Sequence, residues 1–253
     1  MSSTIWTQCA ASSDIRPFAA RPWRSVEAQH QSSTRKLVDT VEEQEILEEI
    51  LEQHKPPLPA GAARLHYLLA TPFRYPPLRH GSRFGSKHER GIWYGAEEIH
   101  AMFAEVAYYR LLFIYGSEAD LGMVEVQLTL FRASMSTEFG LDLTDKRFRK
   151  CRDVLGSKDS YAATQQLGKD MREAGVKAFR YFSARTLKPE SCIGVLDPTA
   201  FNRKKPTSFS TWYCFADKSR VEFKRTGTTA NDAIYTFPVT DFLVEGKLPE
   251  PAP

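Results

Sequence analysis

The chain has 253 residues, of which 42% are hydrophobic and 26% charged, and its formal net charge is +3. This is the composition of an ordinary globular protein, long enough for one large domain or one domain with an extension. The small net charge, with no dense block of lysine and arginine, argues against a nucleic-acid-binding protein.

The sequence also argues against membrane insertion, export and cysteine-based stabilisation. It contains no stretch of about 18 uncharged apolar residues. The first residues lack the basic and apolar regions of a secretory signal, so we expect a cytoplasmic protein that does not act at a membrane. The four cysteines form no Cys-x-x-Cys pair, which argues against a zinc site and against a disulfide framework; they are Cys9, Cys151, Cys192 and Cys214.

The N-terminal part predicts one helix. Residues 1–31 show no clear periodicity, whereas Thr40-Val-Glu-Glu43 has the form of a capping box. Apolar residues then recur at helical spacing as far as His54, and Lys55-Pro-Pro ends the helix. We therefore predict an extension over residues 1–60. The favoured interpretation packs the apolar stripe on the main body, and the alternative is an arm that binds a partner or dimerises.

The first half of the main domain, predicted over residues 61–253, is rich in loops. The apolar run 65–71 suits a strand, and proline and glycine interrupt the chain from 73 to 94. Residues 92–94 predict a brief buried strand. The acids of Ala96-Glu-Glu98 favour the first turn of a long apolar helix.

The second half of the main domain is predicted to consist mostly of strands. Residues 124–130 alternate strictly between apolar and polar, which is typical of a half-buried strand. A helix is predicted over 160–174, closed by Gly175. The remaining predicted strands are 178–183, 192–196, 211–215, 221–225 and 233–238, the last three as a β meander. Because strands outnumber helices and do not alternate with them, the fold class is α+β.

One carboxylate stands out within the long apolar helix. Glu105 lies in the middle of a run from Ile99 to Phe113 that is apolar almost throughout. An ionised side chain there costs several kcal/mol, roughly, unless it is paired or faces a polar cleft. Glu105 therefore either serves a site or pairs with a neighbour such as Arg110.

Cations and aromatic rings precede this carboxylate in tight turns. The segments are Phe73-Arg-Tyr-Pro-Pro77, Gly81-Ser-Arg-Phe-Gly85 and Gly91-Ile-Trp-Tyr-Gly95. Together with an embedded acid they predict a site for an anionic, ring-bearing ligand such as a nucleotide. The structural alternatives are surface-loop arginines and a core tyrosine. The histidines form no ligand pair at i, i+4 spacing, so we expect no metal.

The order and spacing of these motifs resemble the RES-domain family, which is named for its arginine, glutamate and serine and is best known for bacterial toxins of toxin–antitoxin pairs. The family pattern is an Arg-Tyr, a glycine-rich Arg-aromatic, a tyrosine at a strand end, and a glutamate eleven residues after that tyrosine. The matching residues are Arg74, Tyr75, Arg83, Phe84, Tyr94 and Glu105, where 105 minus 94 is eleven. The tract from Tyr161 to Arg185 is similar to the family's second half, so the resemblance covers about residues 65–198.

The resemblance implies a fold related to ADP-ribosyltransferases, with mixed and antiparallel strands and flanking helices, and an activity that destroys NAD+. Family members split the nicotinamide–ribose bond, and some use inorganic phosphate as acceptor, giving ADP-ribose-1″-phosphate. NAD+ is then a substrate and not a cofactor. The implied catalytic residues are Glu105, Arg74 and Tyr94, and the implied binding residues are Arg83, Tyr75, Ser183 and Arg185.

These residue types suit that chemistry. A fixed carboxylate such as Glu105 stabilises an oxocarbenium-like ribose. The guanidinium groups of Arg74 and Arg83 match phosphate oxygens bidentately. Tyr75 and Tyr94 offer flat faces to the nicotinamide or adenine ring.

The resemblance leaves several points open. The implied partner is a cognate antitoxin, in a complex that can contain oligomers. Only nine positions separate Arg74 from Arg83, and the polar contact expected near the later helix falls to Ser160, Thr164 or Gln165. The alternatives are a protein ADP-ribosyltransferase using the same site and a non-catalytic module that binds antitoxin or nucleotide.

Overall fold

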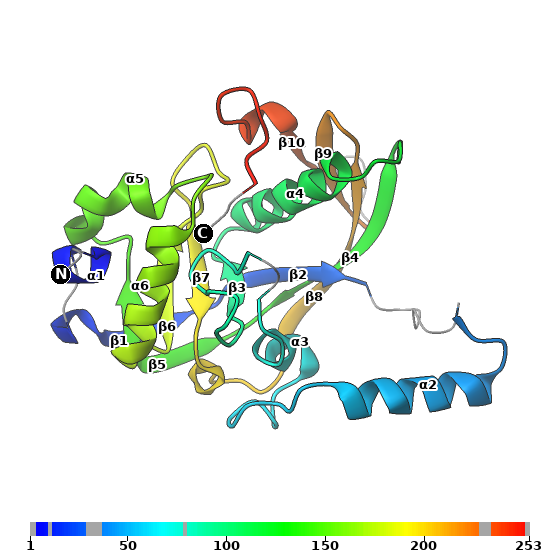
Figure 1. Cartoon of the computed structure of the whole chain (residues 1–253), viewed down its shortest axis with the longest axis horizontal. Coiled ribbons are helices and arrows are strands. Elements are labelled where there is room, and N and C mark those ends of the chain that lie inside the picture. Colours follow the sequence, from blue (N-terminus) through cyan, green and yellow to red (C-terminus); the bar gives the residue numbers. More distant parts are fainter. Residues whose placement is uncertain (1–3, 10–11, 29–36, 78–79, 228–233, 251–253) are drawn as a thin grey trace.

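The structure is a computed structural model that describes residues 4–9, 12–28, 37–77, 80–227 and 234–250 (Figure 1). In this part of the chain ten strands form one mixed sheet with the order β1-β5-β6-β7-β3-β2-β4-β8-β9-β10. The predicted α+β class is confirmed. Among the described residues, no helix combines the length and apolarity needed to cross a membrane.

The strands are β1 (Arg16–Ala20), β2 (Trp23–Glu27), β3 (Trp93–Ala96), β4 (Val124–Arg132), β5 (Met135–Asp142), β6 (Ala178–Phe182), β7 (Ser191–Val195), β8 (Thr207–Ala216), β9 (Arg220–Arg225) and β10 (Ile234–Pro238). The α-helices are α1 (Ile5–Cys9), α2 (Val41–His54), α3 (Tyr67–Ala70), α4 (Ile99–Tyr115), α5 (Arg152–Leu155) and α6 (Ala162–Glu173). Short 3-10 helices are η1 (Ser12–Asp14), η3 (Thr71–Phe73), η4 (Lys146–Cys151), η5 (Pro198–Ala200) and η6 (Val239–Asp241).

Most neighbouring strands are antiparallel. The exception is the pair β5 and β6, which is parallel and is joined through η4, α5 and α6. Strands β8, β9 and β10 form the predicted meander by antiparallel pairing. Ala233, which the prediction included in the last strand, lies outside the described residues.

Side chains alternate between two apolar layers, one on each face of the sheet, because successive strand residues point to opposite faces. Trp93 and Ile193 pack with α3 and Phe201 in one layer. Their neighbours Tyr94 and Cys192 belong to the other layer, which includes α4 and α6. The candidate site described below includes residues of this second layer, among them Tyr94, Tyr108 and Tyr181.

Three strands (β1, β2 and β5) and three short α-helices (α1, α3 and α5) were not predicted. β1 and β2 join the central sheet by pairing with β5 and with β3 and β4, although residues 1–31 show no periodicity. β5 was also missed. The predicted strand over 65–71 is wrong, since His66 caps the helix α3 there by accepting from the Leu68 N–H. Short apolar runs suit a buried strand and a buried helix equally well, so periodicity alone cannot separate them.

The helix predicted after Thr40 is confirmed as α2, with both hydrogen bonds of the capping box between Thr40 and Glu43. The favoured packing of its apolar stripe on the main body is wrong, because no residue of α2 is buried. Figure 1 shows α2 extending away from the sheet. Its contact with the main domain is made instead by Glu52, which accepts from Arg74 Nη1 at 3.0 Å.

One cysteine pair corrects the expectation that the chain has no disulfide. Cys9 at the end of α1 is bonded to Cys151 at the end of η4, across 142 positions of sequence. The sequence did not indicate this pair because its members are far apart in the chain and share no motif. Cys192 and Cys214 are buried free thiols.

Candidate active site

The centre of the candidate site is a hydrogen bond between two of the predicted residues. Ser183, directly after β6, donates from Oγ to Glu105 Oε1 on α4 at 2.6 Å. The same Oγ accepts from the Arg185 N–H at 3.0 Å. The serine hydroxyl therefore fixes one carboxylate oxygen and is itself oriented by the backbone, which leaves the second oxygen of Glu105 available to a ligand.

Two buried guanidinium groups lie near this carboxylate. Arg185 is 2% exposed, stacks on the ring of Tyr108 with its Cζ 3.5 Å from the ring centroid, and donates to the Lys158 carbonyl at 3.0 Å. Arg83 is 5% exposed and donates to the carbonyls of Leu155 and Ser157. Among the described residues, Arg83 Nη2 and Arg185 Nε are buried with no hydrogen-bond partner. Such groups are rare in folded proteins unless they serve a ligand, an ion or water.

Electrostatics link Arg83 to the carboxylate. Burial is the largest single influence on Arg83 and lowers its pKa, but the combined attraction of Glu105 and of three nearby tyrosines outweighs burial, so the pKa is raised above the ordinary value. An effect of this kind requires the two charges to lie close together in a poorly solvated place. The structure therefore brings Glu105, Ser183, Arg185 and Arg83 together as predicted.

Four tyrosines that the sequence analysis gave no role complete the surroundings. Burial, and then the Cys192 thiol and the Glu105 carboxylate, raise the pKa of Tyr181 well above its usual range. Burial also raises the pKa of Tyr108 and that of Tyr109. Tyr109 is 53% exposed as a whole residue, but its phenol contacts Tyr161. Helical spacing could have indicated Tyr108 and Tyr109, which follow Glu105 at i+3 and i+4.

Tyr94 lies at the sheet side of the same layer. Its hydroxyl forms a 2.9 Å hydrogen bond with Ser82 Oγ and accepts from the Phe84 N–H at 3.2 Å. Burial is the main cause that raises its pKa to about 12, so the phenol stays neutral below that pH. Tyr94 thus holds the loop that carries Arg83.

Replacing Tyr94 by phenylalanine tests this support. The Phe84 N–H would lose its partner in a buried place, and we expect a loss of about 1–3 kcal/mol in the free energy of unfolding. The measurement is urea denaturation. Tyr67→Phe is the control, because the Tyr67 ring is 55% exposed and the change should have no measurable effect. Equal stability of Tyr94→Phe and the parent chain would contradict the role given to this hydroxyl.

The helix α6 holds the Arg83 loop from the other side. Gln165 Nε2 donates to the carbonyls of His80 and Ser82 at 2.9 and 3.1 Å. Of the three residues left open by the sequence, Gln165 therefore contacts the loop. Thr164 bonds back to the Tyr161 carbonyl within the helix turn, and the Ser160 N–H bonds Ser157 Oγ.

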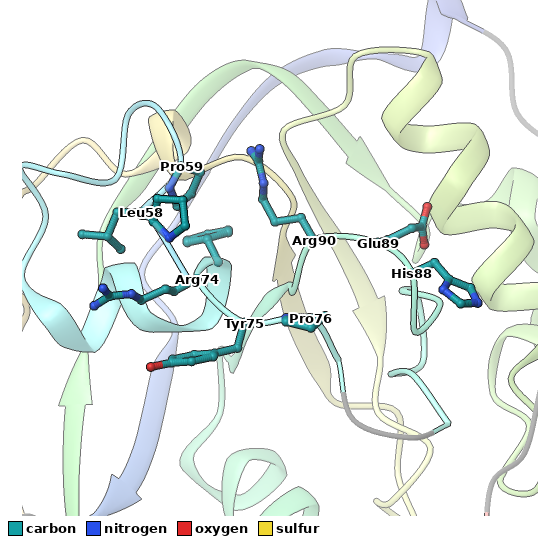
Figure 2. A pocket seen from close by; sticks show the side chains of 10 residues that line it. Leu58, Pro59, Arg74, Tyr75, Pro76, His88, Glu89 and Arg90 are labelled. Atoms are coloured by element: carbon teal, nitrogen blue, oxygen red, sulfur yellow. The ribbon is translucent and has the colours of Figure 1, made fainter. Parts of the chain in front are cut away.

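Arg74 and Tyr75 are placed elsewhere. Arg74 Nε donates to the Pro56 carbonyl at 2.5 Å, in addition to its ion pair with Glu52. Both residues line a pocket of about 350 Å³ beside the segment that follows α2. Figure 2 shows Arg74 and Tyr75 on one side of this pocket and His88 and Glu89 on the other. Glu105 and Ser183 do not line it, so the catalytic role given to Arg74 and the binding role given to Tyr75 stay predictions.

No group of three or more histidine, cysteine, aspartate and glutamate side chains within the described ranges has a geometry that could hold a metal ion. The described residues bring to the candidate site a carboxylate, a hydroxyl, two guanidinium groups and several phenols. This set can stabilise developing positive charge and bind phosphate oxygens.

Comparison with known families agrees with the motifs. Residues 58–217, which include the whole candidate site, match the family model described as the RES domain. The chain belongs to the RES-domain family. The family match extends beyond the segment 65–198 that the motifs covered and includes the whole of β8.

One solved structure is similar to this RES protein over most of its length. One chain of the crystal structure of the M. tuberculosis MbcT–MbcA toxin–antitoxin complex is similar to this RES protein, with 12% sequence identity and a TM-score of 0.44. The similarity covers 78% of this chain and 85% of that chain. No curated protein matches the sequence.

Proposed function

We propose that this RES protein is a toxin that depletes NAD+ by cleaving the bond between nicotinamide and ribose, with inorganic phosphate as the acceptor. The observation that carries the proposal is the Ser183–Glu105 hydrogen bond beside two buried guanidinium groups that each retain an unpaired nitrogen. Family membership over residues 58–217 supports it.

The residues have distinct roles in this reaction. The bond from ribose C1″ to the nicotinamide nitrogen breaks, its electron pair stays on nicotinamide, and a phosphate oxygen bonds to C1″. Nicotinamide leaves as a neutral molecule, so no general acid is required. Glu105 stabilises the positive charge that develops on the ribose. Ser183 is a positioning residue, since it acts through Glu105.

The anionic parts of the substrates need cations. Arg83 and Arg185 are buried, and charge-assisted hydrogen bonds to phosphate are strongest in such places. Their two positive charges against one carboxylate leave the site with a net charge of about +1, which favours the NAD+ pyrophosphate or free phosphate. Arg74 and Tyr75 line a separate pocket, and the proposal does not depend on them. In this proposal an antitoxin restrains the enzyme in the cytoplasm.

The test is NAD+ consumption by purified, antitoxin-free protein in buffers with and without inorganic phosphate, with the products identified by mass spectrometry. We expect loss of NAD+ only with phosphate, giving nicotinamide and ADP-ribose-1″-phosphate in equal amounts. Formation of ADP-ribose in both buffers would show that the enzyme hydrolyses NAD+ and does not phosphorolyse it.

Two further results would contradict the proposal in different ways. Nicotinamide release that requires an added protein, with ADP-ribose attached to that protein, would make the chain a protein ADP-ribosyltransferase. No NAD+ loss from protein shown to be folded would leave a non-catalytic module that binds antitoxin or nucleotide.

A further inference from the structure

The segment 239–250 follows β10 and packs beside the candidate site, although it lies outside the family match. The RES match ends at residue 217. Within the segment, Phe242 is fully buried, and Leu248 packs against the apolar cluster that includes α4. Figure 1 shows the segment in red beside α4. A part of the chain that the family model does not include therefore lies against the helix that carries Glu105.

Two contacts join this segment to Tyr108 of α4. The Tyr108 hydroxyl donates to the Pro249 carbonyl at 2.6 Å, and the Tyr108 ring centroid lies 6.1 Å from that of Phe242. Tyr108 is fully buried, so water does not compete for the hydrogen bond. The segment therefore fixes both the hydroxyl and the ring of this tyrosine.

Two neighbours of Arg185 are bonded to the same segment. The first is Tyr108, whose ring centroid is 3.5 Å from Arg185 Cζ, and a guanidinium this close to a desolvated ring is attracted to its face. The second is Lys158. Its carbonyl accepts from Arg185 Nη1 at 3.0 Å, and its own Nζ donates to the Asp241 carbonyl at 3.2 Å. The segment 239–250 thus holds Arg185 through two intermediaries.

These contacts leave one edge of the Arg185 guanidinium for a ligand. Nη1 is bonded to Lys158, whereas Nε has no partner and Nη2 makes only a 3.4 Å contact with the Tyr161 hydroxyl. Nε and Nη2 form the edge that binds two oxygens of one anion. Arg180 uses this edge to bind both carboxylate oxygens of Glu97, each at 2.9 Å. The same edge of Arg185 matches two oxygens of a phosphate group.

We propose that the segment 239–250 positions Arg185 to bind a phosphate group, and that Tyr108 is the positioning residue through which it acts. The inference rests on the proposed function, because the phosphate group is either the NAD+ pyrophosphate or the acceptor phosphate. Tyr108 supports Arg185 from one face of the guanidinium, and its hydroxyl is bonded to Pro249. The hydrogen bond therefore contributes to the affinity for the anion and not to kcat.

The experiment is calorimetric titration of the full chain with ADP-ribose and, separately, with inorganic phosphate. Tyr108→Phe keeps the ring and removes the hydrogen bond to Pro249. It should lower the affinity for one of the two probes about two- to ten-fold and leave the other unchanged. A loss with phosphate assigns Arg185 to the acceptor, and a loss with ADP-ribose assigns it to the pyrophosphate.

Tyr115→Phe is the matched control. Tyr115 lies on the same helix, and its hydroxyl donates to the Lys218 carbonyl at 3.0 Å, also beyond the family match. The tyrosine is 49% exposed and has no contact with Arg185. Its replacement should change the affinity for neither probe.

A double-mutant cycle with Arg185→Lys separates positioning from a merely structural role. Lysine keeps the charge and lacks the planar edge. If Tyr108 acts through Arg185, Tyr108→Phe should have no further effect on affinity in the Arg185→Lys background. An equal loss in both backgrounds overturns the inference. Unchanged affinity of Tyr108→Phe for both probes, an equal loss for both, or a parent chain that binds neither probe also overturns it.

NAD+ consumption by the parent chain tests the proposed function separately. If the parent consumes NAD+ and Tyr108→Phe binds both probes normally, only the inference about the segment 239–250 is overturned. If the parent consumes no NAD+ and Tyr108→Phe shows the expected loss of affinity, only the proposed reaction is overturned.

Discussion

Glu105→Gln should lower the rate of NAD+ consumption at least about 100-fold while leaving NAD+ binding nearly intact. The amide keeps the shape of the side chain and can still accept from the Ser183 hydroxyl at 2.6 Å. It loses the negative charge that stabilises the ribose cation, and a fixed charge at the reacting centre is usually the largest catalytic contribution. The measurements are kcat with saturating phosphate and NAD+ affinity by calorimetry.

The control for this variant is Glu118→Gln. Glu118 follows α4 and is exposed, so its loss changes the net charge by the same amount without touching the site. Its activity should equal that of the parent chain. Full activity of Glu105→Gln would remove this carboxylate from the mechanism, and equal loss of binding and rate would assign it to substrate binding.

Gly168→Ala should lower the free energy of unfolding by at least about 3 kcal/mol and abolish NAD+ consumption. Gly168 of α6 packs against the loop that carries Arg83, and a Cβ there would lie 1.8 Å from the Phe84 carbonyl oxygen and 2.7 Å from its carbon. Both atoms belong to the backbone, so either the helix or the loop must move. Urea denaturation measures the stability, and the NAD+ assay reports the displacement of Arg83.

Gly156→Ala is the matched control. The nearest atom to a Cβ at Gly156 is the Arg152 carbonyl oxygen at 3.3 Å, and its backbone φ of −95° is open to alanine. We expect a change below about 1 kcal/mol. If Gly168→Ala unfolded at the same urea concentration as the parent chain, the close contact between α6 and the loop that carries Arg83 would be contradicted.

The sequence predicted the candidate site better than it predicted the sheet. The spacing of eleven from Tyr94 to Glu105 reflects a real connection, because β3 leads directly into α4 and so fixes their separation. Ser183 and Arg185 were identified through the resemblance alone, and the structure brings them to Glu105 across 78 positions. The tyrosines at 108, 109, 161 and 181 were missed because a tyrosine within an apolar run is normally predicted to be a buried core residue.

Motif order did not predict where Arg74 would lie. Arg74 and Arg83 are nine positions apart, yet Arg74 contacts Glu52 and Pro56, whereas Arg83 lies beneath α5 near Glu105. The segment between them contains two prolines and a glycine at positive φ, and turns of this kind can send the chain in either direction. The distance between the two arginines in space could therefore not be predicted from their spacing in the sequence.

The sequence by itself determined the local features of this protein: the α+β class, the capped helix after Thr40, the helix that carries Glu105 and the C-terminal meander. These depend on periodicity and caps within about 15 residues. Only the tertiary structure decided the strand order, the entry of β1 and β2 into the sheet, the Cys9–Cys151 pair and the exposure of the apolar stripe of α2. Each of these depends on contacts between segments far apart in the chain, whose pairing is set by the packing of the whole core and leaves no local pattern.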